Sequence, residues 1–209
     1  MRTYKVFRIS ALLLLIMLLG LPVKSMAQND LGYLNVDWQF NAPLGGNFAK
    51  KASGWGMNFD LGKYVTPNIG VGLFLAYSTN HKYVPLQTIA LSPTSSLTVR
   101  QQRSLFQLPF GVGLRYRMTD EGICNPYLGL KLGANFAKMT SYFSAYESKN
   151  NTWGFYLSPE IGTSIWFGEG GKIGAHIALY YSFATNKGHL LNGSIDNLNN
   201  IGFRVGIAF

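Results

Sequence analysis

The sequence has few of the residues that would indicate a disulfide-stabilised or nucleic-acid-binding protein. It contains one cysteine, Cys124, so no disulfide can form within the chain. Charged residues make up only 13% of its 209 residues. The formal net charge of +9 falls to +5 if Arg2, Lys5, Arg8 and Lys24 leave with the amino-terminal segment described next. A charge this small and dispersed does not indicate a nucleic-acid partner.

Long apolar runs are also scarce. The run from Ala11 to Leu19 is well short of the roughly 20 residues with which a helix spans a bilayer. Basic residues precede this run and Ser25-Met26-Ala27 follows it, a pattern typical of a secretory signal peptide. We therefore expect a cleaved signal peptide at residues 1–27 and one mature domain at residues 28–209. No later run is long enough for a spanning helix, so a mature membrane protein would have to be a β-barrel.

The sequence does contain alternation with a period of two residues, which is typical of β-strands. Near the carboxyl end, for example, Phe203, Val205 and Ile207 alternate with glycines and Arg204. Eight segments show such a pattern: 32–42, 54–64, 68–79, 103–118, 126–138, 152–167, 172–184 and 199–209. The chain is therefore predicted to be all-β, with eight strands.

The connections between these segments alternate in length. The short ones, at 66–68, 120–122 and 168–171, contain Pro, Asn, Asp or Gly, which tolerate turn geometry. The longer ones are 43–53, 80–102, 139–151 and 185–198. An even strand number with alternating short and long connections is typical of outer-membrane barrels, whose short turns face the periplasm. Both termini would then be periplasmic.

Aromatic residues on the apolar faces gather near the strand ends. The predicted outer ends carry Trp55, Tyr77, Phe106, Phe136, Trp153 and Phe183, and the inner ends carry Tyr116, Phe167 and Phe209. Aromatic rings prefer the two boundaries of a bilayer, so two such belts indicate a membrane barrel. In a soluble barrel the apolar face would point inward, and nothing would favour belts at both rims.

The carboxyl end carries a more specific resemblance. Phe203, Val205, Ile207 and Phe209 resemble the terminal signal that the barrel-insertion machinery reads, and segment 130–136 is similar to a glycine-rich strand pattern. On these residues the mature chain resembles the small bacterial outer-membrane β-barrel domain family, which includes OmpA-transmembrane-like, OmpX-like and PorT-like barrels. The resemblance implies an eight-stranded antiparallel up-and-down transmembrane β-barrel in the cell outer membrane.

Charged residues on the predicted inner face are candidates for a lumen network. They include Asp37, Asp60, Arg115, Lys131, Glu160 and Arg204. A charge inside a narrow barrel needs a partner, because desolvating one alone is costly. The first and last strands become neighbours on closure, so Asp37 is expected to pair with Arg204. On the adjacent fifth and sixth strands, Lys131 is expected to pair with Glu160.

The predicted outer loops are rich in basic residues. Candidate contacts to the phosphates of lipopolysaccharide are Lys50, Lys51, Lys82, Arg100 and Arg103. An ordinary solvated rim explains the same bias equally well. In the longest predicted loop, 80–102, apolar residues indicate either a contact site for a surface partner or an extension of the flanking strands beyond the membrane.

Patterns for catalysis or metal binding are weak. The sequence has no metal-binding spacing, phosphate-cradling loop or serine-nucleophile elbow, so we expect no cofactor and no enzyme activity. The leading function is a structural, surface-recognition or envelope-integrity role. The alternatives are a narrow pore, a secretion-apparatus component as the PorT-like resemblance implies, or a lipid-modifying enzyme that uses His81, His176 or His189.

Overall fold

The computed structural model describes residues 32–46, 48–92, 95–119, 122–143, 146–167, 172–190 and 193–209. The chain divides into two compact units, Met1–Gly32 and Tyr33–Phe209. The second unit contains the barrel described below. The predicted signal peptide at residues 1–27 lies outside the described residues. Within the described ranges, no helix has the length and apolar character needed to cross a membrane.

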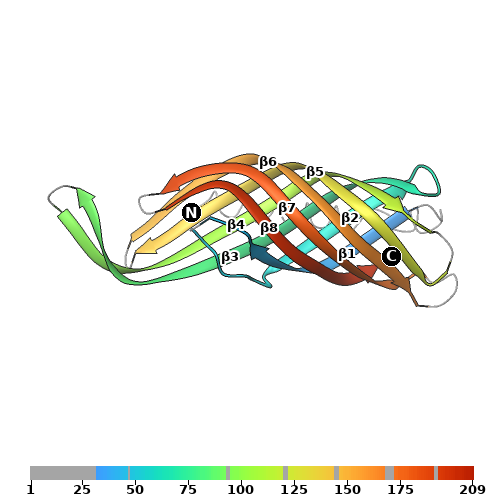
Figure 1. The fold of residues 1–209 in the computed structure, drawn as a ribbon, viewed down its shortest axis with the longest axis horizontal. Helices are drawn as coiled ribbons and strands as arrows, with labels where there is room; N and C mark the ends of the chain where they lie inside the picture. Colours follow the sequence, from blue (N-terminus) through green and yellow to red (C-terminus); the bar gives the residue numbers. More distant parts are fainter. Residues whose placement is uncertain are drawn as a thin grey trace, which may run out of the picture. The chain divides into compact units, whose positions relative to one another are not determined.

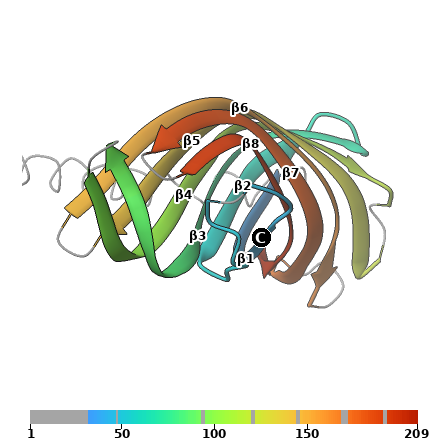
Figure 2. The ribbon, with the colours of Figure 1, turned by 60° about the vertical axis from the view of Figure 1, so that its left-hand side comes forward.

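The described part of the chain forms eight β-strands that close into a barrel (Figures 1 and 2). They are β1 (Gly32–Pro43), β2 (Gly56–Tyr64), β3 (Ile69–Ser92), β4 (Ser95–Arg117), β5 (Cys124–Phe143), β6 (Tyr146–Trp166), β7 (Gly174–Leu190) and β8 (Gly193–Ala208). Consecutive strands are neighbours, and antiparallel pairing of β1 with β8 closes the ring. The predicted fold class, an all-β up-and-down barrel of eight antiparallel strands, is confirmed.

The barrel has two different ends. At the terminal end, where β1 begins and β8 stops, the strands are joined by the connections after β2, β4 and β6. At the hairpin end, β3 and β4 run far beyond their neighbours and bend away as a long hairpin, drawn in green in Figures 1 and 2. The segment 44–55 between β1 and β2 lies at this same end and contains only isolated bridges in its described residues.

Three of the four predictions of a long loop are wrong. Most of 80–102, 139–151 and 185–198 is strand, because β3 to β8 continue toward the hairpin end. Beyond the membrane both faces of a strand can be polar, so the alternation that marks a strand is lost from the sequence. Register shifts between Val84 and Gln87 and between Ala184 and Lys187 disturb it further. For 80–102, the alternative of strand extension is the one observed.

Most exposed large side chains of the barrel are apolar, and most side chains that face inward near the terminal end are polar. On β7, Ile177 and Leu179 are 43% and 61% exposed, whereas His176 between its apolar neighbours is fully buried. On β8, Val205 is exposed and Arg204 is fully buried. A soluble barrel would show the opposite arrangement, because its apolar face would form the core. The exposed apolar surface therefore matches a barrel surrounded by lipid.

The two aromatic belts lie at different heights on this outer surface. Tyr116 of the terminal-end belt is paired with Ile69, and Tyr77 of the other belt lies eight residues further along β3. Eight residues on a strand tilted by about 40° rise roughly 20 Å, close to the apolar height of about 25 Å in outer-membrane barrels. The part of β3 beyond Tyr77, as far as Ser92, therefore projects past the membrane band.

An arginine in the middle of this band should destabilise the barrel. We expect Leu179→Arg to lower the free energy of unfolding by about 2–4 kcal/mol, because the charged group would face hydrocarbon. The measurement is urea unfolding of the protein in lipid vesicles. His189→Arg, at an exposed position of the same strand beyond the band, is the control and should leave the midpoint unchanged. Equal midpoints for both variants would contradict the lipid-facing assignment.

Candidate functional site

The barrel interior contains a balanced cluster of charges near the terminal end. Three carboxylates and three cations belong to it, and each is at most 7% exposed: Asp37, Asp60, Glu160, Arg115, Lys131 and Arg204. They come from β1, β2, β6, β4, β5 and β8, respectively, so six strands contribute one charge each. Because the formal charges cancel, the cluster can be buried without a net charge in the lumen.

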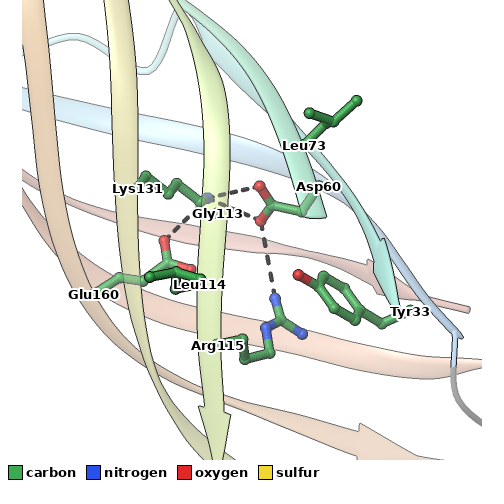
Figure 3. A pocket seen from close by; sticks show the side chains of 8 residues that line it. All are labelled: Tyr33, Asp60, Leu73, Gly113, Leu114, Arg115, Lys131 and Glu160. Atoms are coloured by element: carbon green, nitrogen blue, oxygen red, sulfur yellow. Dashed lines mark hydrogen bonds and ion pairs between the residues drawn. The ribbon is translucent and has the colours of Figure 1, made fainter. Parts of the chain in front are cut away.

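Lys131 holds the centre of this lumen charge network. Its Nζ lies 2.8 Å from Asp60 Oδ1 and 3.1 Å from Glu160 Oε2, as Figure 3 shows. Glu160 also accepts a hydrogen bond from Arg204 Nη1. Gly129, the cross-strand partner of Glu160, leaves the space for this carboxylate: a Cβ there would lie 2.6 Å from Glu160 Cγ. The expected pair of Lys131 with Glu160 is therefore present.

Arg115 joins the network mainly through aromatic rings. Its guanidinium carbon lies 4.2 Å from the ring centroid of Tyr33 and 3.9 Å from that of Tyr127. Its Nη2 is 4.0 Å from Asp60 Oδ2, at the limit of an ion pair. The two rings therefore sandwich the cation, which replaces part of the hydration that burial removes.

The expected pair of Asp37 with Arg204 is wrong. The register of β1 and β8 places Gln39 opposite Arg204 and puts Asp37 opposite Gly206. Arg204 Nε donates to Gln39 Oε1 at 2.9 Å, and the guanidinium reaches across the lumen to Glu160. The topology predicts that β1 and β8 are neighbours, but not their register. The register places Asp37 two residues away from the position opposite Arg204.

Asp37 instead joins a chain that the sequence did not reveal. Its Oδ1 lies 2.6 Å from His176 Nδ1, and His176 Nε2 lies 2.7 Å from the hydroxyl of Tyr127. Tyr127 also donates to Glu160 Oε1 at 3.2 Å. The chain therefore links the two carboxylates through an imidazole and a phenol. His176 is fully buried, so it has no direct contact with lipid around the barrel.

The rest of the lumen is filled toward the hairpin end. Amide side chains come first: Asn135 donates to Asn186 at 2.8 Å, and Asn41 donates to Asn80 at 2.9 Å. An apolar cluster runs from Phe74, whose ring centroid is 5.7 Å from Lys131 Nζ, to the hairpin end, where Phe48 from the 44–55 segment is only 2% exposed. The cavity beside the charge network measures about 10 Å³, room for no more than about one water molecule. The described lumen is therefore packed.

The predicted phosphate contacts fall into two groups. Lys50, Lys51 and Arg100 are exposed at the hairpin end, and Lys82 is half-buried there. Arg103 does not fit the prediction, because it is 7% exposed and points into the barrel, where it donates to Gln101 Oε1. Its prediction as an outer contact assumed a loop, but β4 extends through this position and places it in the inner set.

One acidic group of the rim is already neutralised. Lys149 Nζ lies 2.6 Å from Glu147 Oε2 at the start of β6. Hydrogen bonds from Lys149 and then Tyr142 hold the pKa of the exposed Glu147 carboxyl below its usual value. This pair leaves the positive charge of Lys50, Lys51 and Arg100 uncompensated by Glu147.

The four residues of the predicted insertion signal share the outer face of β8. Val205, Ile207 and Phe209 are exposed, and Phe203 stacks on Phe40 with ring centroids 5.1 Å apart. Phe209 also exchanges two backbone hydrogen bonds with Leu34 of β1, at 2.8 and 3.0 Å. These residues therefore help to close the barrel, and their reading by insertion machinery stays a prediction.

Comparison with known proteins gives a family and a set of similar folds. A family model described as "Outer membrane protein beta-barrel domain" matches residues 11–209. Neisserial surface protein A is 14% identical, with 85% of this chain and 95% of that chain covered and a TM-score of 0.55. OprG from Pseudomonas aeruginosa is 15% identical, with 85% of this chain and 93% of that chain covered and a TM-score of 0.48. Outer membrane protein W of E. coli is 16% identical, with 86% of this chain and 96% of that chain covered and a TM-score of 0.45.

No curated protein matches the chain. At these identities the likeness to the solved structures shows the fold alone.

Removing one partner from the lumen charge network should be costly. We expect Lys131→Met to lower the free energy of unfolding by about 3 kcal/mol, because Asp60 and Glu160 lose their shared cation. Adding Asp60→Asn should restore part of this loss, with a coupling of about 1–3 kcal/mol in a double-mutant cycle measured by urea unfolding.

The exposed pair at the rim supplies the control for this cycle. Lys149→Met also removes a lysine from an ion pair, but Lys149 is 49% exposed. Its unfolding midpoint should match the wild type, because solvent screens the pair. If Lys131→Met and Lys149→Met behaved alike, the lumen network would not be a stabilising core.

Proposed function

The chain belongs to the outer membrane protein beta-barrel domain family, and we propose that it is a closed barrel that binds outer-leaflet lipopolysaccharide with its hairpin end. In this proposal the barrel anchors a recognition surface and does not conduct. It has a structural or surface-recognition role in the envelope and no enzyme activity. The single observation that carries it is that exposed lysines lie beside an aromatic belt at one end of a barrel whose lumen is packed.

The orientation follows from the two unlike ends. The terminal end, with both ends of the barrel sequence, would face the periplasm, and the end where β3 and β4 project as a long hairpin would face outward, as the longer segments of other outer-membrane barrels do. Residues 1–27 would direct export and be removed, and the outward-facing residues of β8 would be read during insertion. All three assignments are parts of the proposal.

The position of the lysines supports contact with lipid phosphates. The backbone of Lys51 donates to His81 O at 3.2 Å, and Thr79 donates to Trp55 O at 3.0 Å. The 44–55 segment is thereby held against β3 just beyond the belt that contains Trp55 and Tyr77. Phosphate groups of a lipid headgroup lie at this height, where exposed ammonium groups can bind them.

The packed lumen favours a closed barrel over a narrow pore. The charge network lies near the terminal end, and the apolar cluster extends from Phe74, beside Lys131, to Phe48 at the hairpin end. An eight-stranded barrel is just wide enough for side chains to fill its interior. A permeating ion would have to displace both sets of side chains.

Charge reversal at the two exposed lysines tests the binding proposal. We expect Lys50→Glu with Lys51→Glu to weaken binding of purified lipopolysaccharide by about tenfold or more at low salt, since each lysine near an anionic surface contributes about 1 kcal/mol. The difference should shrink as salt is added. Lys172→Glu, an exposed lysine at the terminal end, is the matched control and should bind normally. Unchanged binding by the double variant would refute the contact.

Conductance tests the closed lumen. We expect no steady current steps from the wild-type protein in a planar bilayer, with a porin added afterwards as proof that channels are detectable. Phe48→Ala should also remain closed, because the charge network lies deeper in the lumen than this residue. Reproducible steps from the wild type would contradict a closed barrel and favour the narrow pore.

A further inference from the structure

A groove lined by residues of β3, β4 and β5 lies where the β3–β4 hairpin leaves the barrel, beyond the aromatic belt that contains Tyr77. Figures 1 and 2 show the path of this hairpin. Its lining includes Tyr83, Arg100, Gln101, Gln102 and Tyr142. None of these residues belongs to the lumen charge network or to the lysine pair described above. The groove is therefore a second candidate surface at the same end of the barrel.

Two tyrosines flank the groove on one face of the sheet. Gln102 is the cross-strand partner of both Tyr83 on β3 and Tyr142 on β5. The three side chains therefore form one row, with the tyrosines two strand spacings or about 10 Å apart. Tyr83 is 62% exposed and Tyr142 is 46% exposed. Exposed ring faces of this kind carry partial negative charge and attract C–H groups, such as those of a sugar ring.

Gln102 and Arg100 supply the polar groups on the face of the two tyrosines. Both are exposed, and they alternate along β4 with inward-facing residues. Gln101 belongs to the inward set: its side chain is 1% exposed, and its Oε1 accepts from Arg103 Nε at 3.3 Å and Nη2 at 3.2 Å. The groove therefore offers a ligand two aromatic rings, one amide and one guanidinium.

The height of the groove indicates where its ligand comes from. Tyr83 lies six residues beyond Tyr77 of the aromatic belt, which places it roughly 15 Å past the apolar band on a tilted strand. The lysine pair lies between these two levels, because Lys51 is bridged to His81. Moving outward, the chain thus presents an aromatic belt, then ammonium groups, then a groove with tyrosines, amides and the exposed Arg100.

This order matches the order of groups in a glycolipid: acyl chains, phosphates, then sugars. We propose that the groove binds the acidic oligosaccharide of outer-leaflet lipopolysaccharide in the same membrane, with Tyr83 and Tyr142 against sugar rings and Gln102 and Arg100 toward hydroxyl and acid groups. The inference rests on the proposed function, because it extends the same contact from the phosphates to the sugars.

The experiment separates the sugar contact from the phosphate contact. Full-length protein in detergent is titrated with two probes: the phosphate-free core oligosaccharide of the lipopolysaccharide, and lipid A, which has phosphates but no core sugars. Tyr83→Ala with Tyr142→Ala should weaken oligosaccharide binding by about tenfold or more and leave lipid A binding unchanged. Lys50→Glu with Lys51→Glu should do the reverse. Tyr116→Ala, an exposed tyrosine at the terminal end, is the matched control.

Two results would overturn the inference. One is that wild-type protein does not bind the oligosaccharide, or that the double tyrosine variant binds it as tightly as the wild type. The other is that the groove is occupied by a second copy, seen as a dimer in sedimentation that the tyrosine variant abolishes. If lipid A binding survives in the lysine variant while the tyrosine variant loses the oligosaccharide, the phosphate proposal fails and the groove stands. Arg100→Gln gives an additional check: it should weaken binding of the acidic oligosaccharide, because Arg100 is exposed on the face of the two tyrosines.

Discussion

The structure depends on one constraint, that each backbone N–H and C=O group inside a hydrocarbon layer must find a partner within the protein. An open sheet would leave an unpaired row of these groups along each edge. Pairing of β1 with β8 removes both edges, and the reciprocal backbone hydrogen bonds of Leu34 and Phe209 complete the closure at the terminal end. A closed ring has only two faces. The outer face contacts lipid, and the side chains of the inner face fill the lumen.

This division makes the lumen the core of the protein. Because most apolar residues of the band are directed to lipid, the polar groups that face inward there must satisfy one another. The lumen charge network meets this requirement with equal numbers of carboxylates and cations and with links through Tyr127 and His176. A narrow barrel filled in this way is rigid, and its rigidity suits a support for residues at the rim.

The sequence predicts the part of the fold that the membrane constrains. Between the two belts every second residue must be apolar, so the strand pattern is visible and the strand number was predicted correctly. Above Tyr77 that requirement ends, and the strand residues of 80–102 could not be distinguished from a loop. The lumen contacts were only partly predictable: Lys131 meets Glu160, but the register separates Asp37 from Arg204. The burial of Phe48 has no signal in the local pattern, because it depends on how a connection folds back.

The same boundary explains where recognition can develop. A side chain within the band is constrained either by lipid or by the packed lumen, and a change there disturbs insertion or stability. Beyond the band, β3 and β4 keep their backbone pairing to each other, and outward-facing side chains such as Tyr83 and Gln102 contact neither hydrocarbon nor the lumen. The barrel thus fixes the position of the hairpin, while the outward-facing residues of the hairpin need be neither lipid-compatible nor packed in the lumen. Aromatic, amide and basic residues can therefore be combined in one groove, because at this height they serve neither the membrane nor the core.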